Sequence, residues 1–339
     1  MHVMLKSRAK VKVGALLGVV TLAAAACGSS TTSNSGSSTG STTSSSSGST
    51  ANLIKPVSAL KGANIVVGSK QFNEQLLLGQ IAIQVLKAAG ANPVNKLNLA
   101  GSTVARNALT SGRIDMYWEY TGTAWFTYLK HTSPVPGSAA QFQAVKKQDL
   151  NQNQIVWFDM APMNDSYGIA VGPAFESKTH VKTLSQMAQM SHSNPSQVTL
   201  CVETEFNTRT DGLSGMEKTY NMSIPPSNIH VVNQGILYHL GATGSPCNYT
   251  EVYTTDGLIE QLHLTVLQDD KNFFPKYNAA LTMKQQEFNK YPQLQPLFAP
   301  VAAKLTTPVV THLNAEVSSG KTPQEVAHSW LVQEGFIKG

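Results

Sequence analysis

The sequence predicts a two-lobed α/β protein with a ligand-binding site between its lobes. From Asn64 onward, short β-branched runs alternate with amphipathic helical segments, which is typical of α/β sheets. The alternation forms two series, the second of which begins near Tyr167 and precedes a helical C-terminal third. Polar and aromatic side chains follow several of the strands, where open α/β sheets bind their ligands. We expect the sheets to be parallel.

The first series is predicted from hydrophobic periodicity and from helix start and stop signals. Asn73 and Ser102 are expected to be helix N-caps, and Gly90 and Gly112 to end the same helices. The apolar side chains of the first helix repeat on one face. The strands of this series are expected at 64–69, 96–101 and 114–120.

The second series has the same pattern. Its helices are expected around 184–190 and from Gly212, Gln234 and Asp256. In the C-terminal third, Thr307 and Thr322 are each expected to cap a helix that begins with a proline. The strands are expected at 167–172, 198–203, 229–232 and 250–254, with a further one near 264–270 that leaves the series.

The N-terminus has the features of an export signal. Within residues 1–26, a basic segment is followed by an apolar segment. The apolar segment is shorter than the roughly 20 residues of a membrane-spanning helix. The small residues before Cys27 resemble a bacterial lipobox, which predicts lipidation of Cys27; cleavage of an ordinary signal peptide is the alternative. Gly, Ser and Thr dominate the next stretch, so 27–55 is expected to be a disordered tether.

Charge and cysteine content narrow the possible functions. The formal net charge is +5, but the first twelve residues carry four of the basic groups and no acid. The remaining chain is nearly neutral, which argues against binding to nucleic acid. In an exported protein, Cys201 and Cys247 are candidates for a disulfide, with two free thiols as the alternative.

Motifs of enzymes and metalloproteins are not found in the sequence. It has no P-loop, no GxGxxG after a strand and no supported Ser/His/Asp order. The nine histidines show no metal-ligand spacing. We therefore expect no catalytic residue, no metal and no cofactor, and regard an exported enzyme as the weakest alternative.

The residues at the strand ends suit a zwitterion. Two cations and two helix starts are suited to a carboxylate, and tyrosine faces are suited to a trimethylammonium group. Each desolvated ring adds about 0.5–2 kcal/mol. Taken singly, such residues are more often solvated cations or packed rim tyrosines. The candidates are Lys70, Tyr120, Thr123, Asp165, Tyr167, Arg209 and Tyr238.

An ordered series of motifs also resembles a known family. "VGSKQFNEQLLLGQ", "GSTVARNALTSGRIDMYWEYTGTAW", "NDSYGIAV", "ETEFNTRTDGLSGMEKTY", "NQGILY", "YTTDGLI" and "VLQDDKNFFPKYN" are similar to substrate-binding proteins of glycine betaine/carnitine/choline (osmoprotectant) ABC importers. The resemblance implies a bilobal type II periplasmic-binding-protein fold, with two α/β lobes joined by a two-stranded hinge. It also implies roles: carboxylate binding for Lys70, Thr123 and Arg209, and an aromatic cage of Tyr120, Tyr167 and Tyr238 with Asp165 at its edge.

The sequence departs from the family pattern at three positions. Trp118 replaces a proline, Leu258 replaces an arginine, and Leu262 stands at the position of a further cage tyrosine. A cage without that ring would bind a trimethylammonium group less tightly or suit another solute. Tyr253, Tyr117 or Trp118 could compensate.

The expected function is capture of a quaternary ammonium solute and its delivery to an ABC permease. The protein is expected to be exported, lipid-anchored to the outer face of the cell membrane and monomeric, and to contact the membrane only through its anchor. Residues 56–162 plus 267–339 are expected to form one lobe and 163–266 the other. Alternatives are a receptor of the same fold for an amino acid or aromatic compound, and an adhesin or sensory module.

Overall fold

The computed structural model describes residues 53–339. The predicted signal peptide (1–26), Cys27 and nearly all of the predicted tether (27–55) lie outside the described residues. Ile54, close to the end of that tether, already packs against the core, and its N–H donates to the Phe336 carbonyl at 2.9 Å. The folded body therefore begins before residue 56. No helix within 53–339 combines the length and apolar character needed to cross a membrane.

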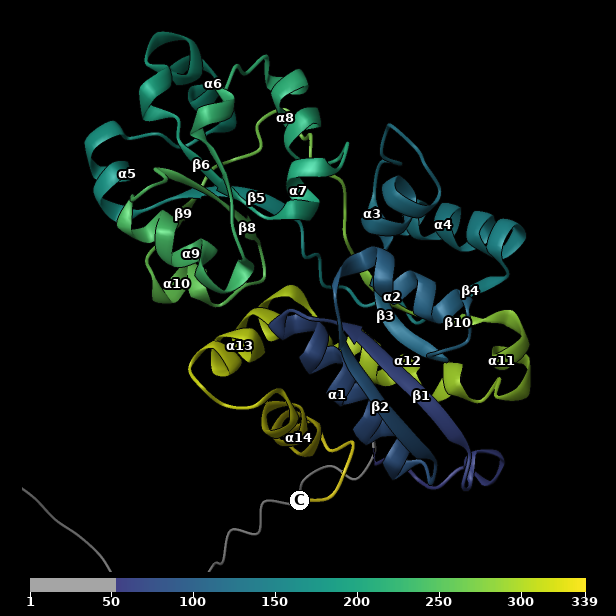
Figure 1. The fold of residues 1–339 in the computed structure, drawn as a ribbon. Coiled ribbons are helices and arrows are strands. Elements are labelled where there is room, and N and C mark those ends of the chain that lie inside the picture. The colour runs from purple at the N-terminus through teal and green to yellow at the C-terminus, as the bar shows by residue number, and fades with distance from the viewer. Residues whose placement is uncertain (1–52) are drawn as a thin grey trace, which may run out of the picture. The chain divides into compact units, whose positions relative to one another are not determined.

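One five-stranded sheet has the order β2-β1-β3-β10-β4 (Figure 1). β1 is parallel to β2 and β3, whereas β10 is antiparallel to both of its neighbours. The strands are β1 (Asn64–Lys70), β2 (Asn92–Leu99), β3 (Met116–Tyr120), β4 (Ile155–Phe158) and β10 (Ala279–Lys284).

Helices cover this first sheet and connect its strands. α1 buries Leu77, Leu78, Ile81 and Val85 completely, as its periodicity predicts, and it also packs against α13 and α14. The helical segments are η2 (Ser58–Leu60), α1 (Asn73–Ala88), α2 (Gly101–Thr110), α3 (Thr121–Thr123), η3 (Ala124–Tyr128), α4 (Ser138–Asn153), α11 (Gln285–Lys290), α12 (Leu294–Lys304), α13 (Thr307–Ser318) and α14 (Pro323–Gln333).

The second sheet has the order β7-β6-β8-β5-β9, with its own helices around it (Figure 1). β6 is parallel to β7 and β8, and β5 is antiparallel to β8 and β9. The strands are β5 (Tyr167–Val171), β6 (Leu200–Val202), β7 (Ile229–Val231), β8 (Tyr249–Tyr253) and β9 (Thr265–Val266). The helical segments are α5 (Pro173–Thr179), α6 (Leu184–Ser193), η4 (Pro195–Gln197), α7 (Thr204–Thr208), α8 (Leu213–Tyr220), η5 (Pro226–Asn228), α9 (Gln234–Thr243) and α10 (Leu258–Gln261).

Two segments carry the chain between the sheets, after β4 and after β9. They are held side by side: Asn278 donates through its amide to the Met163 carbonyl at 2.7 Å, and the Asp165 N–H donates to the Tyr277 carbonyl at 3.2 Å. This is the two-stranded connection expected for a bilobal fold. Within the second sheet, Cys201 and Cys247 form a disulfide with an S–S distance of 2.05 Å.

Two expectations about the sheets are wrong. Both sheets are mixed rather than parallel, and the C-terminal third contains β10, which inserts between β3 and β4. The β10 sequence "AALTMK" has mostly residues that are common in helices, so its strand conformation is imposed by pairing on both sides. The short run "IVWF" of β4 was not expected as a strand at all, because four apolar residues give no usable period.

Three expected helix caps are also wrong. Thr307 is the first residue of α13, and the N-cap is Thr306, whose side chain accepts from the Val309 N–H. α1 is preceded by Phe72, and Asn73 is its first residue, without a capping bond. Ser102 lies within the first turn of α2, whose N-cap is Ala100. The first amides of α2 are satisfied by side chains from elsewhere: Gly101 N–H donates to Gln71 Oε1 and Ser102 N–H to Glu205 Oε1, each at 2.6 Å.

Candidate ligand-binding site

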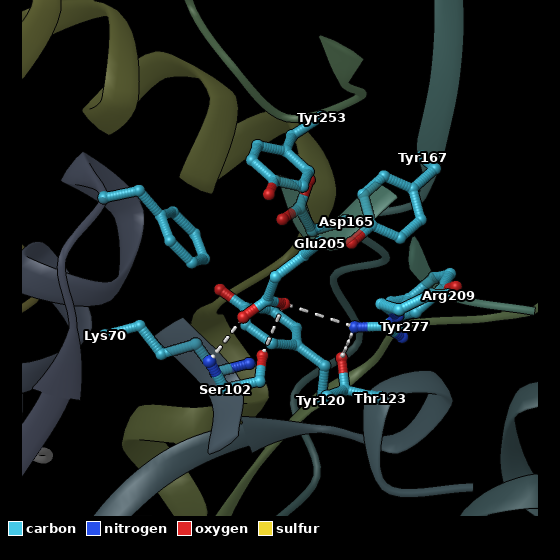
Figure 2. Close-up of a pocket in the computed structure, with 11 residues that line it drawn as sticks. Lys70, Ser102, Tyr120, Thr123, Asp165, Tyr167, Glu205, Arg209, Tyr253 and Tyr277 are labelled. Atoms are coloured by element: carbon cyan, nitrogen blue, oxygen red, sulfur yellow. Dashed lines mark hydrogen bonds and ion pairs between the residues drawn. The ribbon is translucent and has the colours of Figure 1, made fainter. Parts of the chain in front are cut away.

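A small cavity lies where residues following β1 and β3 meet residues of the second sheet (Figure 2). Its volume is about 30 Å³. Tyrosine rings and charged groups are interspersed around it. The lining residues are Lys70, Phe72, Ser102, Tyr120, Thr123, Asp165, Tyr167, Glu205, Arg209, Tyr253 and Tyr277.

The structure brings together six of the seven side chains that the sequence singled out. They come from four separate stretches of the chain, and both sheets contribute. Their convergence follows from topology, because strands β1, β3 and β6 direct their carboxyl ends toward the same region. The six are Lys70, Tyr120, Thr123, Asp165, Tyr167 and Arg209.

Tyr238 does not line the cavity. It lies on α9 with its ring in the apolar cluster behind the second sheet, together with the disulfide, and is 1% exposed. Its hydroxyl accepts a hydrogen bond from the Tyr253 N–H at 2.9 Å. Tyr238 therefore supports the strand that carries Tyr253, and it is Tyr253 whose ring reaches the cavity.

The other positions that could have compensated for Leu262 are not at the cavity. Tyr117 packs in the cluster beneath α4, where its hydroxyl donates to Glu119 at 2.8 Å. Trp118 lies in the main core and is 1% exposed. Leu262 itself packs with the apolar residues around Tyr238. Of the three candidate rings, only Tyr253 contributes to the cavity wall.

Five aromatic rings form a continuous wall on one side of the cavity. Phe72 stacks on Tyr253 at 5.2 Å between ring centroids and lies 6.2 Å from Tyr120. Tyr167 lies 5.4 Å from Tyr253 and 5.4 Å from Tyr277. Neighbouring rings at these separations hold each other in place and present π faces, to which a cation is attracted.

Carboxylates fix the orientation of three of these rings. Tyr120 donates its hydroxyl to Glu74 Oε1 at 2.6 Å, and Tyr277 donates to Asp211 Oδ2 at 2.6 Å. The Tyr253 hydroxyl donates to Glu203 Oε2 at 3.1 Å. Each phenol is thus held by an acceptor outside the ring wall, while Lys70 lies over the Tyr120 ring at 4.9 Å and Arg209 over the Tyr277 ring at 6.0 Å.

A pair of buried acids lies behind the ring wall. The Thr255 hydroxyl contacts both, at 2.5 Å from Glu74 Oε2 and 2.7 Å from Asp165 Oδ1. Asn314 donates to Glu74 Oε2 at 2.8 Å. Burial raises the pKa of both acids, and the charge of Glu74 raises the pKa of Asp165 further. A cation in the cavity would favour the ionised form of this pair.

Lys70 is already paired with a carboxylate. Its Nζ lies 2.7 Å from Glu119 Oε1, which is fully buried, and 4.9 Å from the centre of the Tyr120 ring. Glu119 also accepts hydrogen bonds from the Tyr117 and Tyr128 hydroxyls at 2.8 Å and 2.6 Å. Lys70 therefore neutralises a core carboxylate in this structure.

Arg209 is held mainly by Asp211. Its Nε donates to Asp211 Oδ1 at 2.9 Å, and its Nη2 donates to Oδ2. Its Nη1 lies 3.5 Å from Thr123 Oγ1 and 3.5 Å from Glu205 Oε2. Its guanidinium lies over the Tyr167 ring, 5.5 Å from the ring centre, so it connects the aromatic residues of the cavity with the charged ones.

Glu205 reaches the start of α2 from the second sheet's side of the cavity. It accepts a hydrogen bond from the Ser102 N–H at 2.6 Å and another from the Ser102 hydroxyl at 2.9 Å (Figure 2). Burial alone would raise the pKa of Glu205, but Lys70, the Ser102 bonds and Arg209 outweigh it and lower that pKa. Glu205 is thus an ionised carboxylate inside the candidate site.

Several lining residues were not among the sequence candidates. Phe72 follows Lys70 in the same loop, and Tyr277 precedes the unpredicted strand β10. Ser102 was assigned to capping. Glu205 stands one helical turn before Arg209, and that spacing was a usable signal for it.

The described residues 53–339 contain no group of three or more His, Cys, Asp or Glu side chains arranged to hold a metal ion. The chemistry of the cavity is that of recognition. Aromatic rings, buried acids and paired ions line it together.

Comparisons with known proteins agree with this architecture. Residues 63–333 match the family model described as the substrate-binding domain of ABC-type glycine betaine transport systems. A glycine-betaine-binding protein of Pseudomonas aeruginosa is 32% identical over 80% of this chain and 88% of its own length. The glycine betaine-binding protein YehZ of Escherichia coli K12 is 31% identical over 81% of this chain and 92% of its own.

Solved structures show the same fold. Apo YehZ from Escherichia coli has a TM-score of 0.61 at 29% identity and covers 81% of this chain and 99% of its own. A structure described as a glycine betaine/carnitine/choline ABC transporter has a TM-score of 0.64 at 24% identity. The match covers 79% of this chain and 97% of that chain. The chain belongs to the family of substrate-binding domains of ABC-type glycine betaine transport systems, and it is a transport component rather than an enzyme.

Proposed function

We propose that this protein captures a quaternary ammonium osmoprotectant, of the glycine betaine, carnitine or choline type, and delivers it to the permease of its ABC importer. The carrying observation is the wall of five rings backed by the buried acids Glu74 and Asp165. A trimethylammonium group has no N–H to donate, so it is recognised by π faces and by negative charge nearby. The relatives' names support the same ligand class.

The aromatic rings supply a large part of the affinity. Each desolvated ring adds about 0.5–2 kcal/mol to the binding of a cation. Three to five such rings add about 1.5–10 kcal/mol, whereas micromolar binding corresponds to about −8 kcal/mol after an association cost of at least about 4 kcal/mol, so the buried acids must add to the attraction. The proposed cage is Tyr120, Tyr167, Tyr253, Tyr277 and Phe72, with Asp165 at its edge. In this proposal Tyr253 replaces Tyr238 as a ring of the cage.

Binding is proposed to close two lobes around the ligand. One lobe is 56–162 plus 267–339 and the other is 163–266. Within the described residues the chain passes between the lobes twice, through the segments that follow β4 and β9. Contacts of Arg209 with Thr123 and of Glu205 with Ser102 bridge them. The lobes line a cavity of about 30 Å³, and the solute is proposed to enter it when they separate.

The proposed location is the outer face of the cell membrane, where a lipid on Cys27 would anchor the protein. The protein is proposed to be a monomer. The support is the sequence before residue 53 and membership in a transport family. Cys27→Ser is expected to move the protein from the membrane fraction to the soluble extracellular or periplasmic fraction. Retention of that variant in the membrane fraction would contradict the anchor.

Isothermal titration calorimetry with glycine betaine, proline betaine, carnitine and choline tests the ligand class. At least one of them is expected to bind with a dissociation constant in the micromolar range. Glycine and ethanolamine, which lack the methyl groups, serve as matched controls and are expected not to bind at millimolar concentration. Absence of heat and of thermal stabilisation with all four methylated solutes would remove the ligand class, whereas the fold and the family would stand.

A further inference from the structure

We propose that the turn Thr121-Gly122-Thr123 is a seat for the Tyr277 ring, and that it thereby sets the width of the proposed cage. Thr121 and Gly122 do not line the cavity, so in this inference they are positioning residues that act through Tyr277. A side chain at residue 122 would push the ring toward the solute. The inference rests on the proposed function and adds a determinant of how well a cationic head fits.

Gly122 lies directly against the Tyr277 ring. A Cβ at residue 122 would lie 2.5 Å from Cδ1 and from Cε1 of the ring and 2.9 Å from Cγ. Ordinary van der Waals contact begins at about 3.4 Å, so an added methyl group and the ring cannot both keep their places. Packed interiors have few voids that could absorb such an overlap. The ring lies where it does because residue 122 has no side chain.

The backbone conformation of Gly122 does not itself require glycine. The residue is the middle one of the short helix α3, and its φ lies outside the left-handed region. Gly101 differs, because its φ of +79° is a conformation that favours glycine. Any residue could adopt the backbone conformation of residue 122. The close approach of the Tyr277 ring therefore explains the glycine at this position.

Thr121 fixes the backbone on both sides of Tyr277. Its hydroxyl donates to the Lys276 carbonyl at 3.1 Å and accepts from the Asn278 N–H at 3.2 Å. The Thr121 N–H donates to the Asn278 carbonyl at 3.0 Å. The residues before and after Tyr277 are thus held against the turn, and the ring between them is directed onto Gly122.

The seat belongs to a single lobe. The turn and the segment that carries Tyr277 both lie within the proposed lobe of 56–162 plus 267–339. They adjoin the paired strands β3 and β10, where Tyr120 lies opposite Ala279. The contact between ring and turn therefore does not depend on contacts across the cavity, and it is expected in the open and in the closed arrangement.

Tyr277 has little freedom to avoid an added Cβ. Its ring lines the cavity and lies edge-on to Tyr167, at 5.4 Å between ring centroids (Figure 2). Its backbone N–H donates to Asn164 Oδ1 at 2.8 Å. The ring is therefore expected to move by about 1 Å into the cavity, which is the difference between 2.5 Å and ordinary contact. Such a displacement exceeds the roughly 0.5 Å that binding sites tolerate.

The test is isothermal titration calorimetry of the full chain with glycine betaine and with choline, which share the trimethylammonium head. Gly122→Ala is expected to weaken each solute that the wild type binds by at least about tenfold. Gly79→Ala is the matched control. A Cβ at residue 79, on α1, would also lie 2.5 Å from a side-chain carbon, Leu97 Cδ2, and both residues lie away from the cavity. Its effect on affinity is expected to stay within about threefold.

A double-mutant cycle separates positioning from a general loss of stability. In the Tyr277→Ala background the ring is absent, so Gly122→Ala is expected to change affinity by no more than about twofold. The crystal structure of Gly122→Ala is expected to show the Tyr277 ring displaced by about 1 Å. Thermal melting of each variant confirms that it is folded.

Three results would overturn the inference and leave the proposed function intact. They are unchanged affinity in a folded Gly122→Ala variant, an undisplaced Tyr277 ring in its crystal structure, and a full further loss in the Tyr277→Ala background. If Gly122→Ala does not fold, Thr121→Val decides, because it removes the hydroxyl bonds and is expected to weaken binding only while the ring is present. If the wild type binds neither solute, the proposed function fails, and the ring position in the variant still decides about the seat.

Discussion

The two ends of the cavity differ in how much of their chemistry is left for a ligand. At the aromatic end, the phenol hydroxyls of Tyr120, Tyr253 and Tyr277 are bonded to carboxylates outside the wall. Lys70 lies over the Tyr120 ring and Arg209 over the Tyr167 and Tyr277 rings, whereas among the described residues no cation lies over Phe72 or Tyr253. At the charged end, Lys70, Arg209 and Glu205 each have a partner within the protein. One end is prepared for an incoming group, and the other is satisfied internally.

This difference shows that residue types alone do not define a subsite. A lysine, an arginine and a helix N-terminus together suggest a carboxylate site, but the protein supplies carboxylates to all three. Glu119 and Asp211 are at most 1% exposed. Their ion pairs with Lys70 and Arg209 therefore stabilise the fold as well as lying at the site. Substitutions at the two ends separate the structural role of the charged end from the binding role of the aromatic end.

The largest effect is expected from Lys70→Met, on stability. Loss of the ammonium group leaves Glu119 buried without its cation, which costs about 3 kcal/mol of unfolding free energy. Choline binding is expected to be no weaker, because Lys70 is compensated and repels a cation. Thermal melting and calorimetry of the same sample measure both.

The matched control is Lys182→Met, the same substitution in an exposed pair with Glu176. Its melting temperature is expected to equal that of the wild type, since exposed pairs contribute little. If Lys70→Met bound choline at least tenfold more weakly with an unchanged melting temperature, the charged end would be a direct ligand contact and the comparison would fail.

The next effect is expected from Tyr120→Ala, on binding. Removal of one face of the ring wall is expected to weaken a quaternary ammonium solute at least tenfold, about 1.4 kcal/mol or more. Tyr120→Phe keeps the ring and loses only the hydroxyl bond to Glu74, so a smaller loss is expected. Calorimetry of both variants gives the two values.

Tyr238→Phe is the control outside the cavity. It removes the acceptor of the Tyr253 N–H but leaves the ring wall complete, and its effect on affinity is expected to stay within about threefold. A loss in Tyr238→Phe as large as in Tyr120→Ala, or unchanged affinity in Tyr120→Ala, would refute the assignment of the rings.

The parts of the site that the sequence predicted are those next to a strand with a clear pattern. Lys70 follows β1, Tyr120 ends β3 and Arg209 follows β6 by a short helix, so a topological rule was sufficient to place them together. The family resemblance supplied the ligand class. The two α/β series also follow directly from alternating periods along the chain.

The parts that were missed depend on contacts between distant segments. Tyr277 reaches the cavity because β10 pairs between β3 and β4, and nothing local in "AALTMK" favours a strand. Tyr238 was misplaced because a helical residue at a strand end can face either the ligand or the sheet, and here it faces the sheet. The capping of α2 by Glu205 could be predicted only with knowledge of how the second sheet lies against the first, because Ser102 and Glu205 are distant in the sequence.

The smallest effect is expected from pH, and its sign follows from the acid pair. The pKa of Asp165 and that of Glu74 are raised in the unliganded protein, first by burial and then, for Asp165, by the charge of Glu74 and of Asp256. A bound cation favours the ionised pair and lowers both pKa values, so binding releases protons. Affinity for choline is therefore expected to rise with pH between the ordinary carboxyl pKa, about 4, and neutrality.

Calorimetry at pH 5 and pH 7.5, in buffers of different ionisation enthalpy, measures both the affinity and the proton release. We expect binding to be about threefold to tenfold weaker at pH 5. Asp165→Asn removes one acid of the pair, so its affinity is expected to be lower at pH 7.5 and to change less with pH. Tighter binding at pH 5 than at pH 7.5, or proton uptake on binding, would show that the aromatic end is not backed by titrating carboxylates. The contrast between the two ends would then rest on the rings alone.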